Sequence, residues 1–377
     1  MIDSVFPRGR VVPSGDVLER HGFIRELTER LVQGDSIMLA GPRRTGKTCV
    51  ASETLRRVRE RGCYTLEMDL FHTATLQDFA LRLLEKTVQL RTGILHSTVQ
   101  TVKEFTKALG RPDIFLKIED LELHAKLNSV NPSPSELIDI ALTTMERIAQ
   151  KDQHRLIVLI DEFQEIDRLG GTALLKQLRS IMQYQQGVSY LFLGSEPSLM
   201  QTLFADRRQA FYRFATLLHL PDIDAEEWRQ YAQHKFAQAS LSIQPDAFQL
   251  MIEQTGSHPF CVMAVLSEAY VWAKLTGGHT IDLTIMHQTL LNTYQRLEGI
   301  YDELWKRILS IPKASQVLEY LVQHKPPYQS GGSTQVQRAL TALVNTSILR
   351  KERRGHYTFI EPMFKNWILQ QLALPTL

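Results

Sequence analysis

The sequence predicts an α/β fold in which a doubly wound parallel sheet is followed by an all-α segment and a C-terminal unit of two helices and a hairpin. Short apolar runs alternate with helical patterns over residues 37–220, which is typical of parallel βαβ units. The run LIVLI at residues 156–160 has no polar face, as expected for a strand covered on both sides. After Pro221 the pattern is helical throughout residues 225–297, so we expect a domain boundary beyond the sheet.

The elements follow one another in a regular order along the chain. Strands are predicted at residues 37–40, 63–69, 156–160, 188–193 and 214–220, and helices at 23–32, 49–60, 75–91 and 171–186. A further helix is predicted to start within residues 131–136 and to run to about residue 151. A helix at 98–109 and a hairpin of 114–118 with 121–125 are predicted outside the main sheet. In the last unit, helices at 313–324 and 333–345 precede short strands at 348–350 and 357–360, which is the pattern of a winged helix.

A glycine-rich loop, GPRRTGKT at residues 41–48, follows the first strand and precedes a helix. This G-x-x-x-x-G-K-[ST] pattern in that setting is typical of a phosphate-binding P-loop. The glycines let backbone N–H groups surround an oxyanion, Lys47 can reach the β- and γ-phosphates, and the Thr48 hydroxyl can ligate Mg²⁺. The expected nucleotide contacts are the loop and the residue after it: Gly41, Pro42, Arg43, Arg44, Thr45, Gly46, Lys47, Thr48 and Cys49.

Polar residues end three of the other predicted strands. Asp161 and Glu162 follow the buried run, where a carboxylate is costly unless it faces a cation or water. We expect Asp161 to hold Mg²⁺ and Glu162 to activate the attacking water, unless the acidic pair merely ends the strand. Ser195 could contact the γ-phosphate or the water as a catalytic residue, or could cap a helix. Asp69 either faces the site or caps a turn.

Three arginines, Arg207, Arg208 and Arg213, precede the fifth predicted strand. A guanidinium supplied by a neighbouring subunit can neutralise charge in the transition state of phosphoryl transfer. Arg213 is the favoured candidate, and a solvated basic face is the alternative. A homo-oligomer is expected for the same reason.

These motifs together resemble the archaeal ATPase family, which comprises P-loop ATPases of the ASCE class in the AAA+/STAND group. The resemblance rests on the P-loop, DEFQ at residues 161–164, Gly194-Ser195 and the run at 211–213, and it extends to residues 255–260 and 364–368. It implies a P-loop NTPase (AAA+-like) parallel-sheet core over residues 1–223, an all-α lid over 224–298 and a C-terminal winged-helix domain over 299–377. It also implies ATP or ADP with Mg²⁺ as ligands.

In the lid, the resemblance implies that Pro259 contacts the adenine side of the nucleotide, with His258 as a weaker contact, although a proline there also suits a helix start. Relatives carry an R-x-x-E-[IL] box before the first strand. Arg20 fits this box, whereas Phe23 takes its acidic position, which weakens the expectation of adenine contacts from residues 18–24.

Charge is distributed unevenly along the chain. Its 43 Lys and Arg and 41 Asp and Glu give a net charge of +2, too small to indicate nucleic-acid binding by itself. Residues 301–377 contain ten Lys or Arg and five Asp or Glu, a local charge of +5. Residues 333–356 are therefore the candidate contact for duplex DNA, and a separately encoded protein is the alternative partner.

The remaining composition indicates the compartment. Three cysteines without metal-type spacing are typical of a reducing compartment. No stretch predicts a signal peptide or a membrane span, so a cytoplasmic location is expected.

The leading hypothesis is an ATP-hydrolysing AAA+/STAND-type molecular switch, slow or partner-stimulated, that signals through the winged helix to DNA or a protein. One alternative is a DNA-binding loader or transposition-type regulator that oligomerises on DNA with ATP. Another is a STAND-like defence or signalling module with little turnover.

Overall fold

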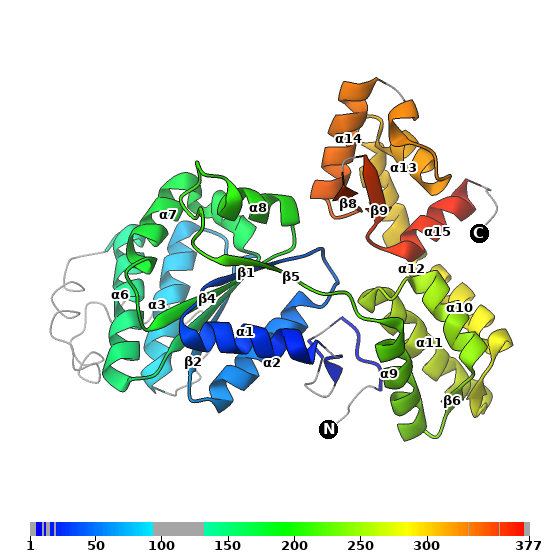
Figure 1. The fold of residues 1–377 in the computed structure, drawn as a ribbon, viewed down its shortest axis with the longest axis horizontal. Helices are drawn as coiled ribbons and strands as arrows, with labels where there is room; N and C mark the ends of the chain where they lie inside the picture. Colours follow the sequence, from blue (N-terminus) through cyan, green and yellow to red (C-terminus); the bar gives the residue numbers. More distant parts are fainter. Residues whose placement is uncertain are drawn as a thin grey trace.

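A five-stranded parallel sheet with helices on both faces forms one half of the molecule, and two helical units form the other half (Figure 1). The computed structural model describes residues 5–9, 11–12, 16–18, 20–92, 132–330, 332–353 and 355–372. The helix predicted at 98–109 and the hairpin predicted at 114–125 lie outside these residues. No helix in the described ranges is both long and apolar enough to span a bilayer.

The sheet has the strand order β2-β3-β4-β1-β5, and every neighbouring pair is parallel. Its strands are β1 (Ile37–Ala40), β2 (Tyr64–Asp69), β3 (Leu156–Asp161), β4 (Val188–Gly194) and β5 (Thr216–His219). β4 lies between β1 and β3, which is the additional-strand arrangement implied by the resemblance. The predicted parallel-sheet core is therefore confirmed.

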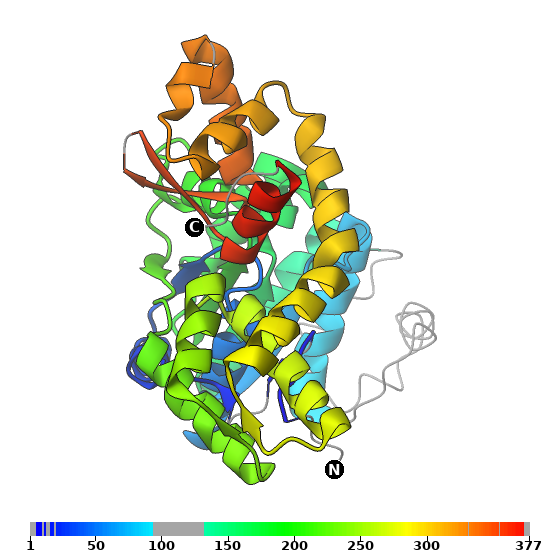
Figure 2. The same cartoon turned by 90° about the vertical axis from the view of Figure 1, so that its right-hand side faces the viewer.

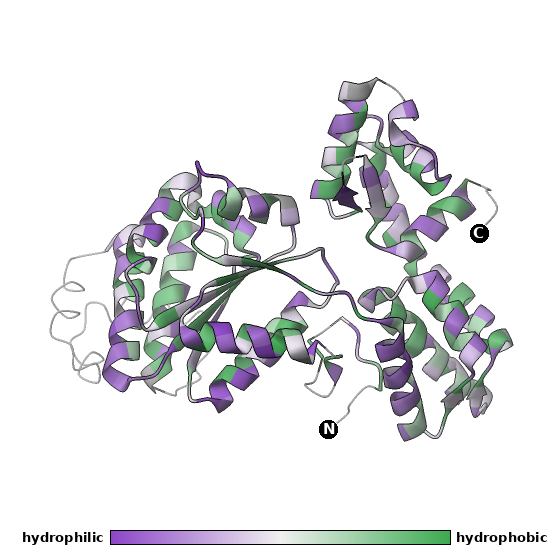
Figure 3. Ribbon diagram, viewed as in Figure 1, coloured by the Kyte–Doolittle hydropathy of each residue, from purple (hydrophilic) through white to green (hydrophobic). Residues whose placement is uncertain are grey.

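Alternating side chains of the three central strands, β1, β3 and β4, enter two different cores. Ile157 and Leu159 of β3 pack with α1 (His21–Gln33) and α2 (Lys47–Glu60). Val158 and Ile160 pack on the opposite face with α3 (Leu76–Thr92), α6 (Pro134–Asp152) and α7 (Ile166–Met182). Both faces of the central part of the sheet are thus apolar, and its strands are largely green in the hydropathy colouring (Figure 3).

Helix boundaries depart from the predictions where local signals compete. α6 begins as predicted, because Ser133 and Glu136 form a capping box around Pro134. α7 begins at Ile166, after a short 3-10 turn at Phe163–Glu165, and ends at Met182. Gly171 is not helical, with φ 53° and ψ −144°, so α7 consists of two helical segments, and the second starts where the helix of 171–186 was predicted.

The lid consists of α9 (Ala225–Gln238), α10 (Pro245–Thr255), α11 (Pro259–Thr276) and the first part of α12 (Leu283–Leu309). The prediction of a wholly helical segment is wrong at β6 (Ser242–Ile243) and β7 (Thr280–Ile281), which pair in parallel. Both strands are short connectors that follow helix ends, and each buries an isoleucine. Their backbones lie side by side, so they form a two-residue ladder.

The C-terminal unit contains α13 (Ala314–Val322), a 3-10 turn at Pro327–Ser330, α14 (Ser333–Asn345), the antiparallel pair β8 (Leu349–Arg353) and β9 (His356–Phe359), and α15 (Pro362–Gln371). This is the predicted order of two helices and a wing. The predicted boundary after residue 298 falls inside α12, which runs continuously from the lid into this unit (Figure 2).

The lid and the C-terminal unit share one hydrophobic core. Met251 and Cys261 of the lid belong to the same buried cluster as Tyr301, Phe364 and Trp367. Gly256, at the end of α10, leaves room for the ring of Pro362, since a Cβ at this glycine would lie 2.6 Å from the proline Cγ. The lid and winged helix are therefore packed as a single body, and the three-domain division stays a prediction.

Candidate functional site

The P-loop lies at the carboxyl end of β1, where ligands bind in open parallel sheets. Lys47 is 7% exposed, and its Nζ donates to the carbonyl oxygens of Gly41 and Pro42, each at 2.6 Å. Burial lowers the pKa of Lys47 to about 8, against the opposing effect of the Glu162 and Asp161 carboxylates. Among the described residues, this buried amine donates to two carbonyl oxygens of its own loop, and phosphate oxygens can take the place of these acceptors.

Arg20 binds the backbone of the P-loop. It was not among the predicted site residues. Its Nη1 donates to the Thr45 carbonyl at 2.8 Å and would lie 3.0 Å from a Cβ at Gly46, whose φ is +92°. Burial lowers the pKa of Arg20 to about 10, although Asp222 opposes this shift. The matching position in the R-x-x-E box is the sequence signal for this residue. The contact is to the loop backbone, so Arg20 fixes the shape of the phosphate cradle.

Thr48 and Asp161, the predicted magnesium ligands, lie together at the mouth of the loop. The Thr48 hydroxyl donates to Asp161 Oδ2 at 3.3 Å, and burial raises the pKa of Asp161. No group of three or more metal-binding side chains occurs within the ranges that the structure describes. Two protein oxygens suit Mg²⁺, which takes its remaining ligands from water and substrate phosphates. This donor set therefore fits a Mg²⁺–nucleotide complex.

Glu162 is held in place by its neighbours. Its Oε2 accepts from the backbone N–H of Ser195 at 3.2 Å, from the Ser195 hydroxyl at 2.7 Å and from Gln164 Nε2. Burial raises the pKa of Glu162, but the bonds from Gln164 and Ser195 and the charge of Lys47 outweigh it, so the net shift is downward. The backbone of Glu162 is in the left-handed region, at φ 51°. Gln164 was not predicted as a site residue, and its only signal is its place in DEFQ.

Ser195 faces the site and does not cap the next helix. The N-cap of α8 (Pro197–Ala205) is Glu196, which makes no side-chain capping bond. Ser195 is 2% exposed, and its Oγ lies 3.3 Å from Arg43 Nε of the P-loop. Asp69 Oδ1 accepts from the backbone N–H of Phe71 at 2.9 Å and caps a turn, while Asp69 also pairs in register with Asp161, so a site role for it stays a prediction.

The three arginines before β5 lie away from this P-loop. Arg213 precedes the first residue of β5, so it lies at the amino end of the sheet, opposite the carboxyl end that carries the loop. It lines a cavity there with Asp35 and Arg179. Arg207 is exposed, and Arg208 forms an ion pair with Asp206. A catalytic role for Arg213 therefore requires a second subunit, and it stays a prediction.

The lid approaches the P-loop through the start of α11. The Arg44 guanidinium lies over the ring of Phe260, 4.3 Å from its centroid. His258 is 7% exposed, and neither ring nitrogen has a hydrogen-bond partner in the part of the chain that the structure describes. Burial and the charges of Arg350 and Arg44 lower the pKa of His258 to about 4. Pro259 occupies the first turn of α11, and its predicted contact with the adenine side of the nucleotide stays a prediction. The contact that the structure shows between the lid and the P-loop is made by Phe260 with Arg44.

Comparisons with known proteins agree with the fold. The chain is similar in structure to a Walker-type ATPase of Pyrococcus abyssi, with a TM-score of 0.67 and 17% identity over 97% of this chain and 99% of the other. It is also similar to the ORC2 protein of Aeropyrum pernix in ADPNP–ADP complexes, with a TM-score of 0.60 and 15% identity over 98% of each chain.

A third similar structure is the Aeropyrum pernix ORC1 protein in complex with DNA, with a TM-score of 0.50 and 15% identity over 98% of this chain and 96% of the other. At these identities the solved structures share the fold with this chain. A comparison with curated proteins found no match. A family model described as an ATPase domain predominantly from Archaea matches residues 18–265. Since this match covers more than half of the sequence, the chain belongs to that ATPase family, as the P-loop and the Asp161-Glu162 pair predicted.

Proposed function

We propose that the protein is an ATP-hydrolysing molecular switch whose turnover is slow or partner-stimulated. The observation that carries this proposal is Glu162, a half-buried carboxylate beside the Thr48–Asp161 pair. A carboxylate next to a metal ligand is suited to orienting water and accepting its proton. Hydrolysis is therefore favoured over transfer to a second substrate.

The other residues of the site have separate tasks in this proposal. The P-loop N–H groups and Lys47 bind the phosphates, and Thr48 with Asp161 would hold Mg²⁺, which neutralises charge on the phosphate oxygens. Ser195 and Gln164 hold the Glu162 side chain through its Oε2. Homo-oligomers would supply Arg213 of one subunit to the nucleotide of the next.

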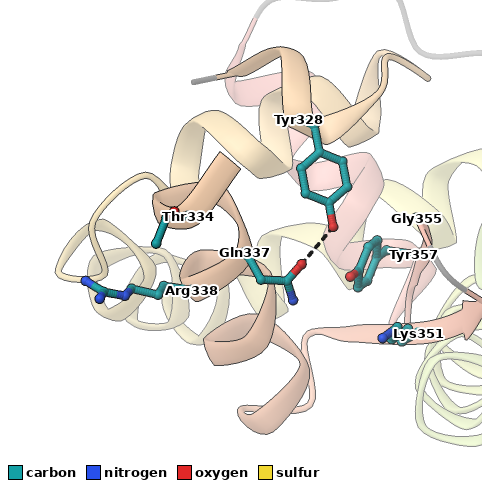
Figure 4. A pocket seen from close by; sticks show the side chains of 7 residues that line it. All are labelled: Tyr328, Thr334, Gln337, Arg338, Lys351, Gly355 and Tyr357. Carbon is teal, nitrogen blue, oxygen red and sulfur yellow. Dashed lines mark hydrogen bonds between the residues drawn. The ribbon is translucent and has the colours of Figure 1, made fainter. Parts of the chain in front are cut away.

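The output surface in this proposal is a groove between α14 and the wing. It has a volume of about 810 Å³ and is lined by Tyr328, Thr334, Gln337, Arg338, Lys351, Gly355 and Tyr357. Figure 4 shows Tyr328 and Tyr357 near the amide end of Gln337, with the Tyr328 hydroxyl donating to Gln337 Oε1 at 2.8 Å. The lining has two cationic side chains and no acidic one.

Duplex DNA is the favoured partner of this groove. Cationic side chains bind phosphates without regard to sequence, while glutamine and threonine on a helix can reach base edges. One protein of similar fold was solved in complex with DNA. A separately encoded protein is the alternative partner, and salt dependence separates the two, because DNA affinity falls steeply with salt.

ATP turnover of the Glu162→Gln variant, measured with and without duplex DNA, tests this proposal. We expect turnover to fall by about 10²- to 10⁴-fold, the range that one general base contributes, while ATP binding is retained. Glu165→Gln is the matched control, because Glu165 forms an ion pair with Arg168 on the surface. Wild-type turnover in the Glu162→Gln variant would refute the catalytic assignment. Turnover that DNA leaves unchanged would favour a protein partner.

A further inference from the structure

The C-terminal unit touches the ATPase core through one hydrogen bond close to the catalytic glutamate. The Ser347 hydroxyl, in the turn between α14 and β8, donates to the backbone carbonyl of Ser195 at 3.1 Å. Ser347 and Ser195 are 152 residues apart in sequence. The same serine at the end of β4 therefore contacts both the winged helix and Glu162.

Ser195 uses every one of its polar groups in this arrangement. Its N–H and O–H donate to Glu162 Oε2, its Oγ accepts from Arg43 and Gln164 at 3.3 Å each, and its carbonyl accepts from Ser347. The N–H and the carbonyl of Ser195 belong to the two peptide groups on either side of its Cα, so hydrogen bonds to both restrict the backbone torsions φ and ψ of this residue. A displacement of the Ser347 hydroxyl therefore moves the Ser195 backbone, and the N–H and Oγ of Ser195 pass this movement to the Glu162 carboxylate.

Two further contacts fasten the same unit to the core. Arg44 of the P-loop lies 3.8 Å from Glu361, the N-cap of α15, and Arg350 of the wing lies 3.4 Å from Asp222. Both pairs have an exposed member, and exposed pairs contribute little to stability. The Ser347 bond differs from them because its acceptor belongs to a buried residue.

We infer that Ser347 is a positioning residue that restrains Glu162 through Ser195, so that docking of the winged helix keeps ATP turnover low. In the docked state Glu162 Oε2 accepts three hydrogen bonds. These three donors occupy the oxygen that would otherwise accept a hydrogen bond from the attacking water. Release of the Ser195 peptide frees this oxygen for water.

The inference rests on the proposed function and specifies its regulation. α14 carries the Gln337 and Arg338 side chains of the output groove, and Ser347 lies two residues after the last residue of this helix. α14 also contacts α8 of the core. A duplex bound along α14 would therefore compete with docking, and would stimulate turnover by breaking the Ser347–Ser195 bond.

The test uses substitutions that respect the backbone of this turn. Ser347 has φ 57°, in the left-handed region, which glycine and asparagine tolerate. Ser347→Gly removes the donor without backbone strain, and Ser347→Asn keeps a donor. Thr346→Ala is the matched control, because the Thr346 hydroxyl donates only within its own helix, to the carbonyls of Ala342 and Leu343.

We expect Ser347→Gly to raise basal kcat roughly 2-fold to 10-fold, the range that one hydrogen bond spans, with little change in KM. Ser347→Asn and Thr346→Ala should stay within about twofold of wild type. In a Glu162→Gln background the gain should vanish, because the restrained group is gone. A fall or no change in kcat, or an equal gain in that background, would overturn the inference.

Hydrogen exchange provides a readout that does not depend on turnover. Ser347→Gly should speed amide exchange in the segment spanning residues 188–200, whereas Thr346→Ala should not. Unchanged exchange in this segment would overturn the inference whatever the ATPase rates are. Absence of turnover in wild type and every variant would instead count against the proposed ATPase, and faster exchange would still support the Ser347–Ser195 coupling.

Discussion

The junction between the lid and α15 leads to a stability prediction that a matched pair of glycines can test. Gly256 ends α10 and Gly277 ends α11, and both adopt left-handed conformations with φ values of 56° and 68°. A Cβ at Gly256 would lie 2.6 Å from Cγ of Pro362, whereas a Cβ at Gly277 meets nothing within 4 Å. Alanine at the two positions thus carries the same backbone cost and different packing costs.

The expected magnitudes follow from these two terms. Alanine in the left-handed conformation costs about 1 to 2 kcal/mol relative to glycine, and this applies to both variants. Overpacking against Pro362 adds about 1 to 3 kcal/mol for Gly256→Ala alone. We therefore expect the Gly256→Ala variant to be less stable than the Gly277→Ala variant by about 1 to 3 kcal/mol.

Denaturant unfolding followed by tryptophan emission measures this difference. All four tryptophans, Trp228, Trp272, Trp305 and Trp367, lie beyond residue 223, so the signal reports the lid and winged helix rather than the sheet. Equal unfolding free energies for the two variants would refute the tight packing of α15 on the end of α10. It would also remove the main reason for treating the lid and winged helix as one body.

Two pH predictions complete the set. Because the pKa of Lys47 is lowered to about 8, its charge and the ATP affinity should be full below pH 8 and decline above it, with Kd rising about tenfold between pH 7 and pH 9 in equilibrium binding. A Kd for ATP that stays constant between pH 7 and pH 9 would refute the burial of the Lys47 amine in the nucleotide-free protein. The pKa of His258 is depressed from 6.5 to about 4, so the stability that depends on its neutral form is complete above pH 6.5 and is lost as the pH falls to 4. In acid unfolding, His258→Gln should be less sensitive to this pH change than wild type by about 3 kcal/mol, and an unchanged slope would contradict the burial of a neutral imidazole.

The sheet and the P-loop were predictable because each rests on a strong local pattern. Apolar runs with no polar face identify buried parallel strands, and the spacing of Gly41, Gly46 and Lys47 identifies a phosphate cradle. Asp161 could be paired with that cradle, since the carboxyl ends of parallel strands meet at one edge of the sheet.

The contacts that connect the units could not be predicted in the same way. Arg20 on the Thr45 carbonyl, Ser347 on the Ser195 carbonyl and Arg44 over Phe260 join residues 25, 152 and 216 positions apart. None of these pairs has a spacing rule, because tertiary packing alone brings its members together. The β6–β7 ladder was missed for a related reason, since two residues are too few to show alternation.

The unbroken course of α12 through the lid and into the winged helix gives the protein a stiff lever. Its 27 residues span about 40 Å at 1.5 Å per residue. A tilt of 5° at the lid end would displace the far end by about 3 to 4 Å. A donor and an acceptor that separate by this distance no longer form a hydrogen bond. A small movement of the lid around a nucleotide would thus be magnified into a displacement large enough to break a single hydrogen bond such as Ser347–Ser195.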